Sequence, residues 1–71
     1  MSTWTWRYER ADGSPATALP PGLPEGFPAQ SDAESWIGEE WRTLLDAGVD
    51  AVSLLEDDRA VYGPMSLHPP A

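Results

Sequence analysis

The segment SDAESWIGEEWRTLLDAGV, residues 31–49, decides the fold because it has the pattern of one amphipathic helix with its own start and stop signals. Its apolar residues share the three- to four-residue spacing of a single helix face: Ala33, Ile37, Trp41, Leu44 and Leu45. Ser31 and Glu34 have the spacing of a capping box, and Gly48 is a favoured residue directly after a helix end. We therefore predict a helix over residues 32–47.

Two segments precede this helix, one with alternating aromatic residues and one rich in proline. Trp4, Trp6 and Tyr8 alternate with polar residues, which predicts a half-buried strand over residues 3–10. Residues 14–30 contain five prolines, and proline lacks a backbone donor and restricts the residue before it. We therefore predict a loop over residues 14–30 that lies on the domain, with a short fourth strand near residues 16–19 as an alternative.

Downstream of the helix, two strand-like segments flank Asp57-Asp58 and predict a hairpin with a two-residue loop. The strands are expected over residues 49–56 and 59–65. This loop length sets a register of cross-strand pairs: Glu56 with Arg59, Leu55 with Ala60, Leu54 with Val61, Ser53 with Tyr62 and Val52 with Gly63. The register places Leu54 and Val61 toward the helix, and Leu55 and Tyr62 on the opposite sheet face.

These elements predict one α+β domain over residues 1–71, with β-α-β-β order and one amphipathic helix packed on a three-stranded sheet. We expect the first strand and the strand after the helix to run parallel, joined by a right-handed crossover. The position of the first strand in the sheet stays open. Gly38 inside the helix predicts close approach by another element, and residues 68–71 are expected to form a loose tail.

The charge is one-sided, with twelve acidic residues against four arginines and a net charge of −8. This balance argues against nucleic acid and against an anionic membrane surface, because both require basic clusters. It permits a basic protein partner, although the charge can equally serve solubility alone. Repulsion between copies predicts a monomer or a weak homodimer. The sequence shows neither an apolar run of about 18–20 residues nor a signal-peptide pattern, so we expect a cytoplasmic protein without membrane binding.

Residue types also limit the chemistry. The chain has no cysteine and no lysine, which excludes thiolate and Schiff-base nucleophiles, disulfides and cysteine-ligated zinc. The single histidine, His68, lies in the predicted tail. The acidic run at residues 56–58 lacks the spacing of a calcium loop. We therefore expect no catalytic residue, no metal and no cofactor.

The leading hypothesis is a non-catalytic protein–protein interaction module. Its recognition residues would be exposed apolar side chains framed by acids: Trp36, Glu39, Glu40, Leu55, Glu56 and Tyr62. Trp36 has an alternative role, sealing the edge of the core against the proline-rich loop. Two other classes stay open: a small-molecule or peptide-binding domain closed by that loop, and a self-associating structural protein.

Three stretches carry a resemblance to a known group of proteins: FPAQSDAESWIGEEW at residues 27–41, LLDAGV at residues 44–49 and VYGPMSL at residues 61–67. Together they resemble a family of short uncharacterised actinobacterial proteins and cover about half the chain. The resemblance implies a cytoplasmic protein of actinobacterial origin. It implies no activity and no functional residue.

Overall fold

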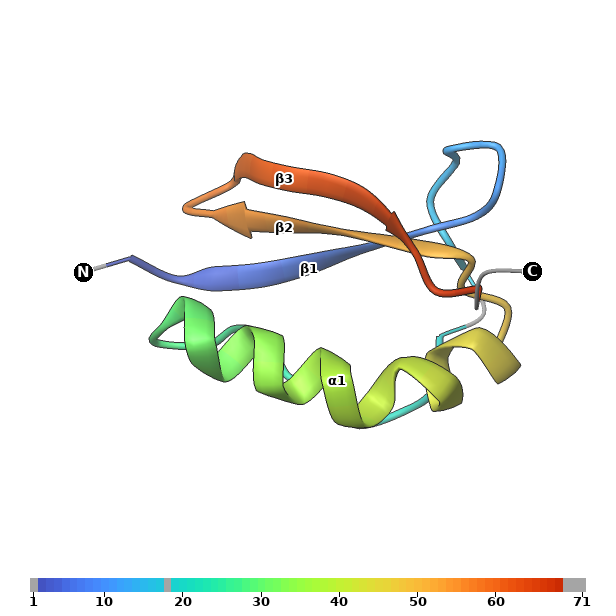
Figure 1. Cartoon of the computed structure of the whole chain (residues 1–71), viewed down its shortest axis with the longest axis horizontal. Helices are drawn as coiled ribbons and strands as arrows, with labels where there is room; N and C mark the ends of the chain where they lie inside the picture. The colour runs from blue at the N-terminus through green and yellow to red at the C-terminus, as the bar shows by residue number, and fades with distance from the viewer. Residues whose placement is uncertain (1, 18, 69–71) are drawn as a thin grey trace.

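A helix packs on one face of a three-stranded antiparallel sheet in the computed structural model, which describes residues 2–17 and 19–68 (Figure 1). The elements follow in the order β1 (Trp4–Glu9), α1 (Gln30–Asp46), β2 (Ala51–Glu56) and β3 (Arg59–Ser66). This is the predicted β-α-β-β arrangement of an α+β domain. The predicted fourth strand includes a residue outside the described range; beside it, Pro15 forms only an isolated bridge with Glu9.

The direction of β1 differs from our prediction, because β1 runs antiparallel to β2 and the sheet order is β1-β2-β3. The proline-rich segment is the reason. It passes behind the helix in Figure 1 and brings Phe27 back to the start of β1, where Trp4 and Phe27 exchange backbone hydrogen bonds of 2.9 and 2.7 Å. The helix therefore begins beside the start of β1 and ends beside its far end. There the Asp50 N–H donates to the Glu9 carbonyl (2.9 Å), and β2 runs back along β1.

The β2–β3 hairpin keeps the predicted register only next to its turn. Glu56 lies opposite Arg59 and Leu55 opposite Ala60, as predicted, but Leu54 lies opposite Tyr62 rather than Val61. Further along, Met65 replaces the predicted Gly63 as the partner of Val52. Extra residues in β3 cause both shifts, and each one changes which face the following side chains occupy. Val61 is consequently 45% exposed, and Tyr62 faces the helix side of the sheet instead of the opposite face.

The core lies between the sheet and α1, and in the described chain eight buried apolar residues form it: Trp6, Ala33, Ile37, Leu44, Val49, Val52, Leu54 and Leu67. Trp6 links the sheet to the helix, because its indole N–H donates to the Ala33 carbonyl oxygen at 3.0 Å. Burial of such large apolar side chains is the main source of stability in a chain of this size.

The sequence predicts the C-terminal end of the helix correctly but not its N-terminal end. The predicted capping box is wrong: α1 begins at Gln30, Ala29 is the N-cap, and no side-chain hydrogen bond caps this end. The β-bridge at Phe27 starts the helix early, so that Ser31 lies within its first turn. The C-terminal stop is confirmed. Gly48 has a φ of 103°, and the Val49 N–H donates to the Leu44 carbonyl (3.0 Å), the bond of a Schellman motif.

Two further expectations about flexibility and packing are corrected. A Cβ placed on Gly38 would meet nothing within 4 Å, so no element of the described chain approaches the helix closely there. His68 is held rather than loose, since its Nε2 lies 2.6 Å from Asp50 Oδ1. The rest of the predicted tail, residues 69–71, lies outside the described range. The described part of the chain contains no helix long and apolar enough to cross a membrane.

Candidate interaction surface

One flank of α1 carries a second stripe of residues beside the buried one. With about 100° per residue, the positions i, i+4, i+7 and i+11 line up along a helix. Glu34, Gly38, Trp41 and Leu45 have this spacing. Their stripe lies about 90° around the helix from the buried stripe of Ala33, Ile37 and Leu44. Glu34 and Gly38 are exposed, whereas Trp41 and Leu45 are partly buried against the core.

Strand β3 faces this flank with two apolar side chains. Tyr62 lies opposite Leu54, and its ring meets Trp6 edge-on at 6.2 Å with an interplanar angle of 74°. Met65 lies opposite Val52 and is 39% exposed. Burial raises the pKa of the Tyr62 phenol, and the nearby Glu34 carboxylate raises it further. The Glu34 stripe and β3 therefore border the same part of the surface.

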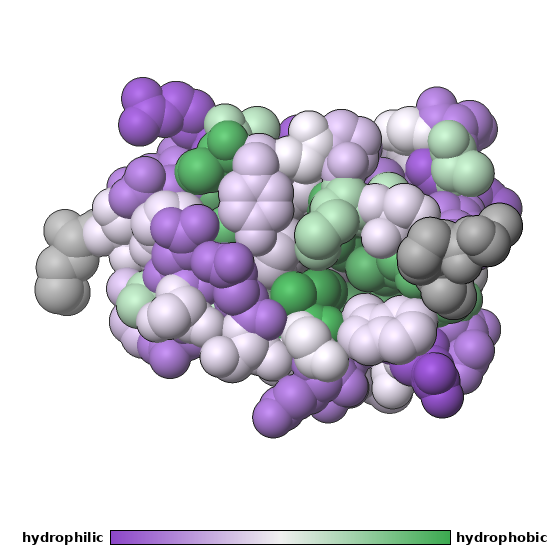
Figure 2. All heavy atoms as spheres, viewed as in Figure 1, coloured by the Kyte–Doolittle hydropathy of each residue, from purple (hydrophilic) through white to green (hydrophobic). Residues whose placement is uncertain are grey.

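We call the strip between them the α1–β3 groove and define it by five residues: Glu34, Gly38, Trp41, Tyr62 and Met65. Figure 2 shows apolar atoms reaching the surface between the sheet and the helix, bordered by paler and more polar residues. Arg42 lies at its outer rim, with its guanidinium carbon 5.2 Å from the centroid of the Trp41 ring. The groove thus combines aromatic side chains, an exposed thioether and one carboxylate, with one guanidinium at its rim.

The opposite flank of α1 is filled by the chain itself. Trp36 packs against Phe27 at 5.7 Å and against Tyr8 at 6.4 Å between ring centroids. Burial raises the pKa of Tyr8 to about 12. Trp36 thus seals the core edge against the proline-rich segment, which was the alternative role that we considered for it. The two flanks differ, because Phe27 and Tyr8 cover one, whereas no residue of the described chain covers Gly38 on the other.

The structure distributes the predicted recognition residues over separate faces. Trp36 and Glu40 lie toward the filled flank, Glu39 lies on the outer face of α1, and Tyr62 lies in the groove. Two residues sit elsewhere on β2: Leu55, on the sheet face away from the helix, and Glu56, beside the turn. The predicted pairing of Leu55 with Tyr62 on one face is wrong, because the extra residue in β3 turns Tyr62 over. Gly38, Trp41 and Met65 were missed, although the spacing of residues 34, 38, 41 and 45 carried the signal.

The open sheet face holds a buried polar pair that sequence reasoning also missed. Glu9 is buried, its Oε2 accepts a hydrogen bond from Ser53 Oγ at 2.5 Å, and Arg7 Nε lies 3.7 Å away. Ser53 is only 1% exposed, so its hydroxyl cannot reach a substrate. The hydrogen bond between Ser53 and Glu9 therefore satisfies the buried polar atoms of both side chains, and the pair has a structural role.

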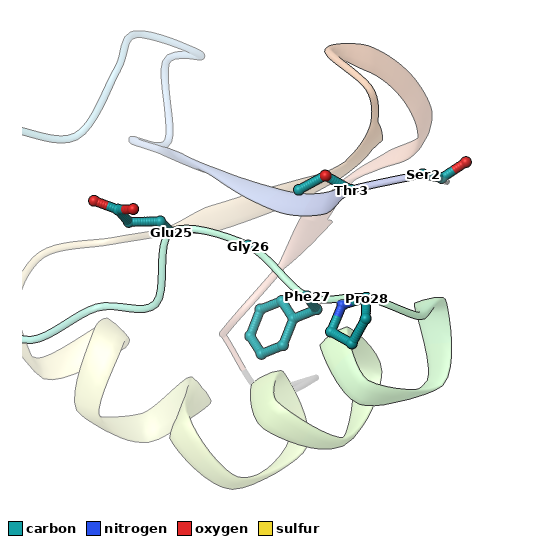
Figure 3. Close-up of a pocket in the computed structure, with 6 residues that line it drawn as sticks. All are labelled: Ser2, Thr3, Glu25, Gly26, Phe27 and Pro28. Atoms are coloured by element: carbon teal, nitrogen blue, oxygen red, sulfur yellow. The ribbon is translucent and has the colours of Figure 1, made fainter.

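A second hollow lies where the proline-rich segment meets the start of β1. It has a volume of about 660 Å³ and is lined by Ser2, Thr3, Glu25, Gly26, Phe27 and Pro28. Figure 3 shows the Phe27 ring directed toward the helix, while Glu25 and Ser2 point away from each other at its two ends. Within residues 2–17 and 19–68, no three acidic or histidine side chains gather where they could hold a metal ion. The α1–β3 groove is the more distinctive surface.

Comparison with known proteins adds no identity: no family model, no curated protein and no solved structure matches this chain. The resemblance to short actinobacterial proteins therefore stays a prediction. The function has to be argued from the geometry.

Proposed function

We propose that this protein is a non-catalytic module that binds a basic segment of another protein. The observation that carries the proposal is the unbalanced charge of α1. The helix has one basic residue, Arg42, and five acidic residues: Asp32, Glu34, Glu39, Glu40 and Asp46. In the described chain, Arg7 pairs with Glu9 and the His68 ring contacts Asp50, and neither contact uses an acid of the helix. The helix therefore offers its negative charge to the surroundings.

An exposed acidic surface of this kind favours association with a basic protein. Complementary potentials raise the rate of encounter and suppress like-charged partners, and salt weakens both effects. The same charge opposes contact between copies, so the proposal includes a monomer or a weak homodimer. It also includes a cytoplasmic location, where proteins without disulfides are usual.

A random peptide library displayed on phage tests the proposal. The wild-type protein and a triple variant with Glu34→Gln, Glu39→Gln and Asp46→Asn would be used as separate baits. We expect the wild-type protein to enrich peptides rich in lysine and arginine, and the triple variant to lose most of that enrichment. The same selection at about 0.5 M salt should also lose it, because the Debye length is then only about 4 Å. Enrichment of neutral or acidic peptides, or equal enrichment by both baits, would contradict the proposal.

A further inference from the structure

We infer that the α1–β3 groove is the docking site for a short basic segment of a partner protein, with an apolar side chain seated at Gly38 between Trp41 and Tyr62. A lysine or arginine of that segment would lie beside Glu34. This inference rests on the proposed function and adds the position and the chemistry of the binding site.

Gly38 supplies the first observation. Glycine within a helix is about 1 kcal/mol less favourable than alanine. A Cβ added at Gly38 would meet nothing within 4 Å, so no neighbour in the described chain requires this glycine. Its backbone φ does not require glycine either, because Gly38 has the ordinary conformation of an α-helix. A partner side chain that packs against the helix backbone would explain the glycine.

The aromatic and thioether side chains supply the second observation. Trp41 and Tyr62 are only partly buried although both pack against the core, and Met65 on β3 is 39% exposed. Aromatic side chains and methionine are enriched at the centres of protein interfaces. On the opposite flank, Phe27 packs against Trp36 from a segment that pairs with β1. By analogy, the occupant of the α1–β3 groove would place an apolar side chain from an extended segment.

The charges select the occupant. The Trp6 ring meets Tyr62 edge-on and its indole N–H donates to the Ala33 carbonyl, which places Tyr62 beside the turn of α1 that carries Glu34. A carboxylate beside an aromatic ring favours a cation by ion pairing and by cation–π contact. Strand β3, the other wall, contains no acid and carries one cation, Arg59, beside the turn. Arg42 lies over Trp41 at the rim, so a cation of the segment is directed to the Glu34 end of the groove. A second copy of this chain would be a poor occupant, because each copy carries a net charge of −8.

Fluorescence anisotropy with a labelled synthetic peptide, one leucine flanked by lysines, tests the inference. Glu34→Gln and Glu39→Gln form a matched pair, since both remove one exposed helix acid but only Glu34 borders the groove. We expect Glu34→Gln to weaken binding about tenfold and Glu39→Gln about twofold or less. Gly38→Ala should weaken binding about fivefold while raising the melting temperature, which excludes unfolding as the cause. Ser35→Ala, on the outer face of α1, is the matched alanine control and should leave binding unchanged.

The outcomes separate the two proposals. If the wild-type protein does not prefer this peptide to one with glutamates in place of the lysines, the proposed function fails, and this inference fails with it. If the preference exists but Glu34→Gln and Glu39→Gln have equal effects, and Gly38→Ala binds like Ser35→Ala, then only the groove is wrong. Weakening confined to the groove variants supports both.

Discussion

Gly63→Ala should be one of the most destabilising single substitutions in this protein, for two separate reasons. Gly63 has a φ of 119°, a conformation that side chains with a Cβ rarely adopt. In addition, an added Cβ would lie 2.8 Å from the Cα and 2.8 Å from the Oγ of Ser53 on the neighbouring strand. Ser53 is buried and donates to Glu9, so it cannot move aside without disturbing that hydrogen bond.

Gly13→Ala separates the two contributions. Gly13 also has a positive φ, 87°, but a Cβ there would meet nothing within 4 Å. Its substitution should therefore cost only the conformational term, about 1–2 kcal/mol. Gly63→Ala adds overpacking against the β2 backbone, about 1–3 kcal/mol, for a total of about 2–5 kcal/mol. A chain of 71 residues has a free energy of unfolding of roughly 4–10 kcal/mol, so this variant should lose a large share of its stability.

Urea unfolding followed by tryptophan fluorescence measures both variants. With a slope of about 1 kcal/mol per molar urea, the Gly63→Ala midpoint should lie about 1–3 M below that of Gly13→Ala. The reasoning about the close contact of β3 with Ser53 would be refuted if the two variants had the same midpoint.

Three further predictions concern the turn, a half-buried phenol and the helix face. Asp58 has a φ of 70°, so Asp58→Gly should raise the free energy of unfolding by about 0.5–1 kcal/mol in the same urea assay, and a loss of stability would count against the turn geometry. Because the pKa of Tyr8 rises to about 12 in the folded state, the unfolded chain releases this proton first; stability should fall as pH rises from about 10 to 12, and Tyr8→Phe should flatten that fall in thermal melts. Leu44 is fully buried whereas Trp41 is half-buried, so Leu44→Ala should cost about 2–5 kcal/mol and Trp41→Ala less; the reverse order in calorimetry would show that the helix face is wrongly assigned.

The sequence was sufficient to predict the elements of this fold, but it did not predict their directions. The spacing of apolar residues located α1, and the Gly48 stop was confirmed at the atomic level. The direction of β1 was missed because it depends on the path of the proline-rich segment. Nothing in the local pattern of residues 14–28 shows that Phe27 returns to pair with Trp4.

The candidate site was predicted less well, for a related reason. A hairpin register counted from the turn assumes regular pairing, and the extra residues in β3 break that assumption after Leu55. Gly63 permits the irregularity through its positive φ, yet a glycine in a strand does not by itself reveal where the pairing shifts. Tyr62 was therefore assigned to the wrong face. Trp36 was identified as an edge residue, but only the structure shows that Phe27 and Tyr8 cover it.

The most direct test of the central claim is a titration of the isotope-labelled protein with the lysine-flanked leucine peptide, followed by amide and indole NMR shifts. We predict that the largest changes fall on Gly38, on the Trp41 indole and on Tyr62, with a smaller response at Glu34 that salt suppresses. The sheet face around Leu55 should stay unchanged. Changes centred on Leu55, or spread evenly over the acidic surface without a maximum in the groove, would contradict the claim that the α1–β3 groove binds a basic segment.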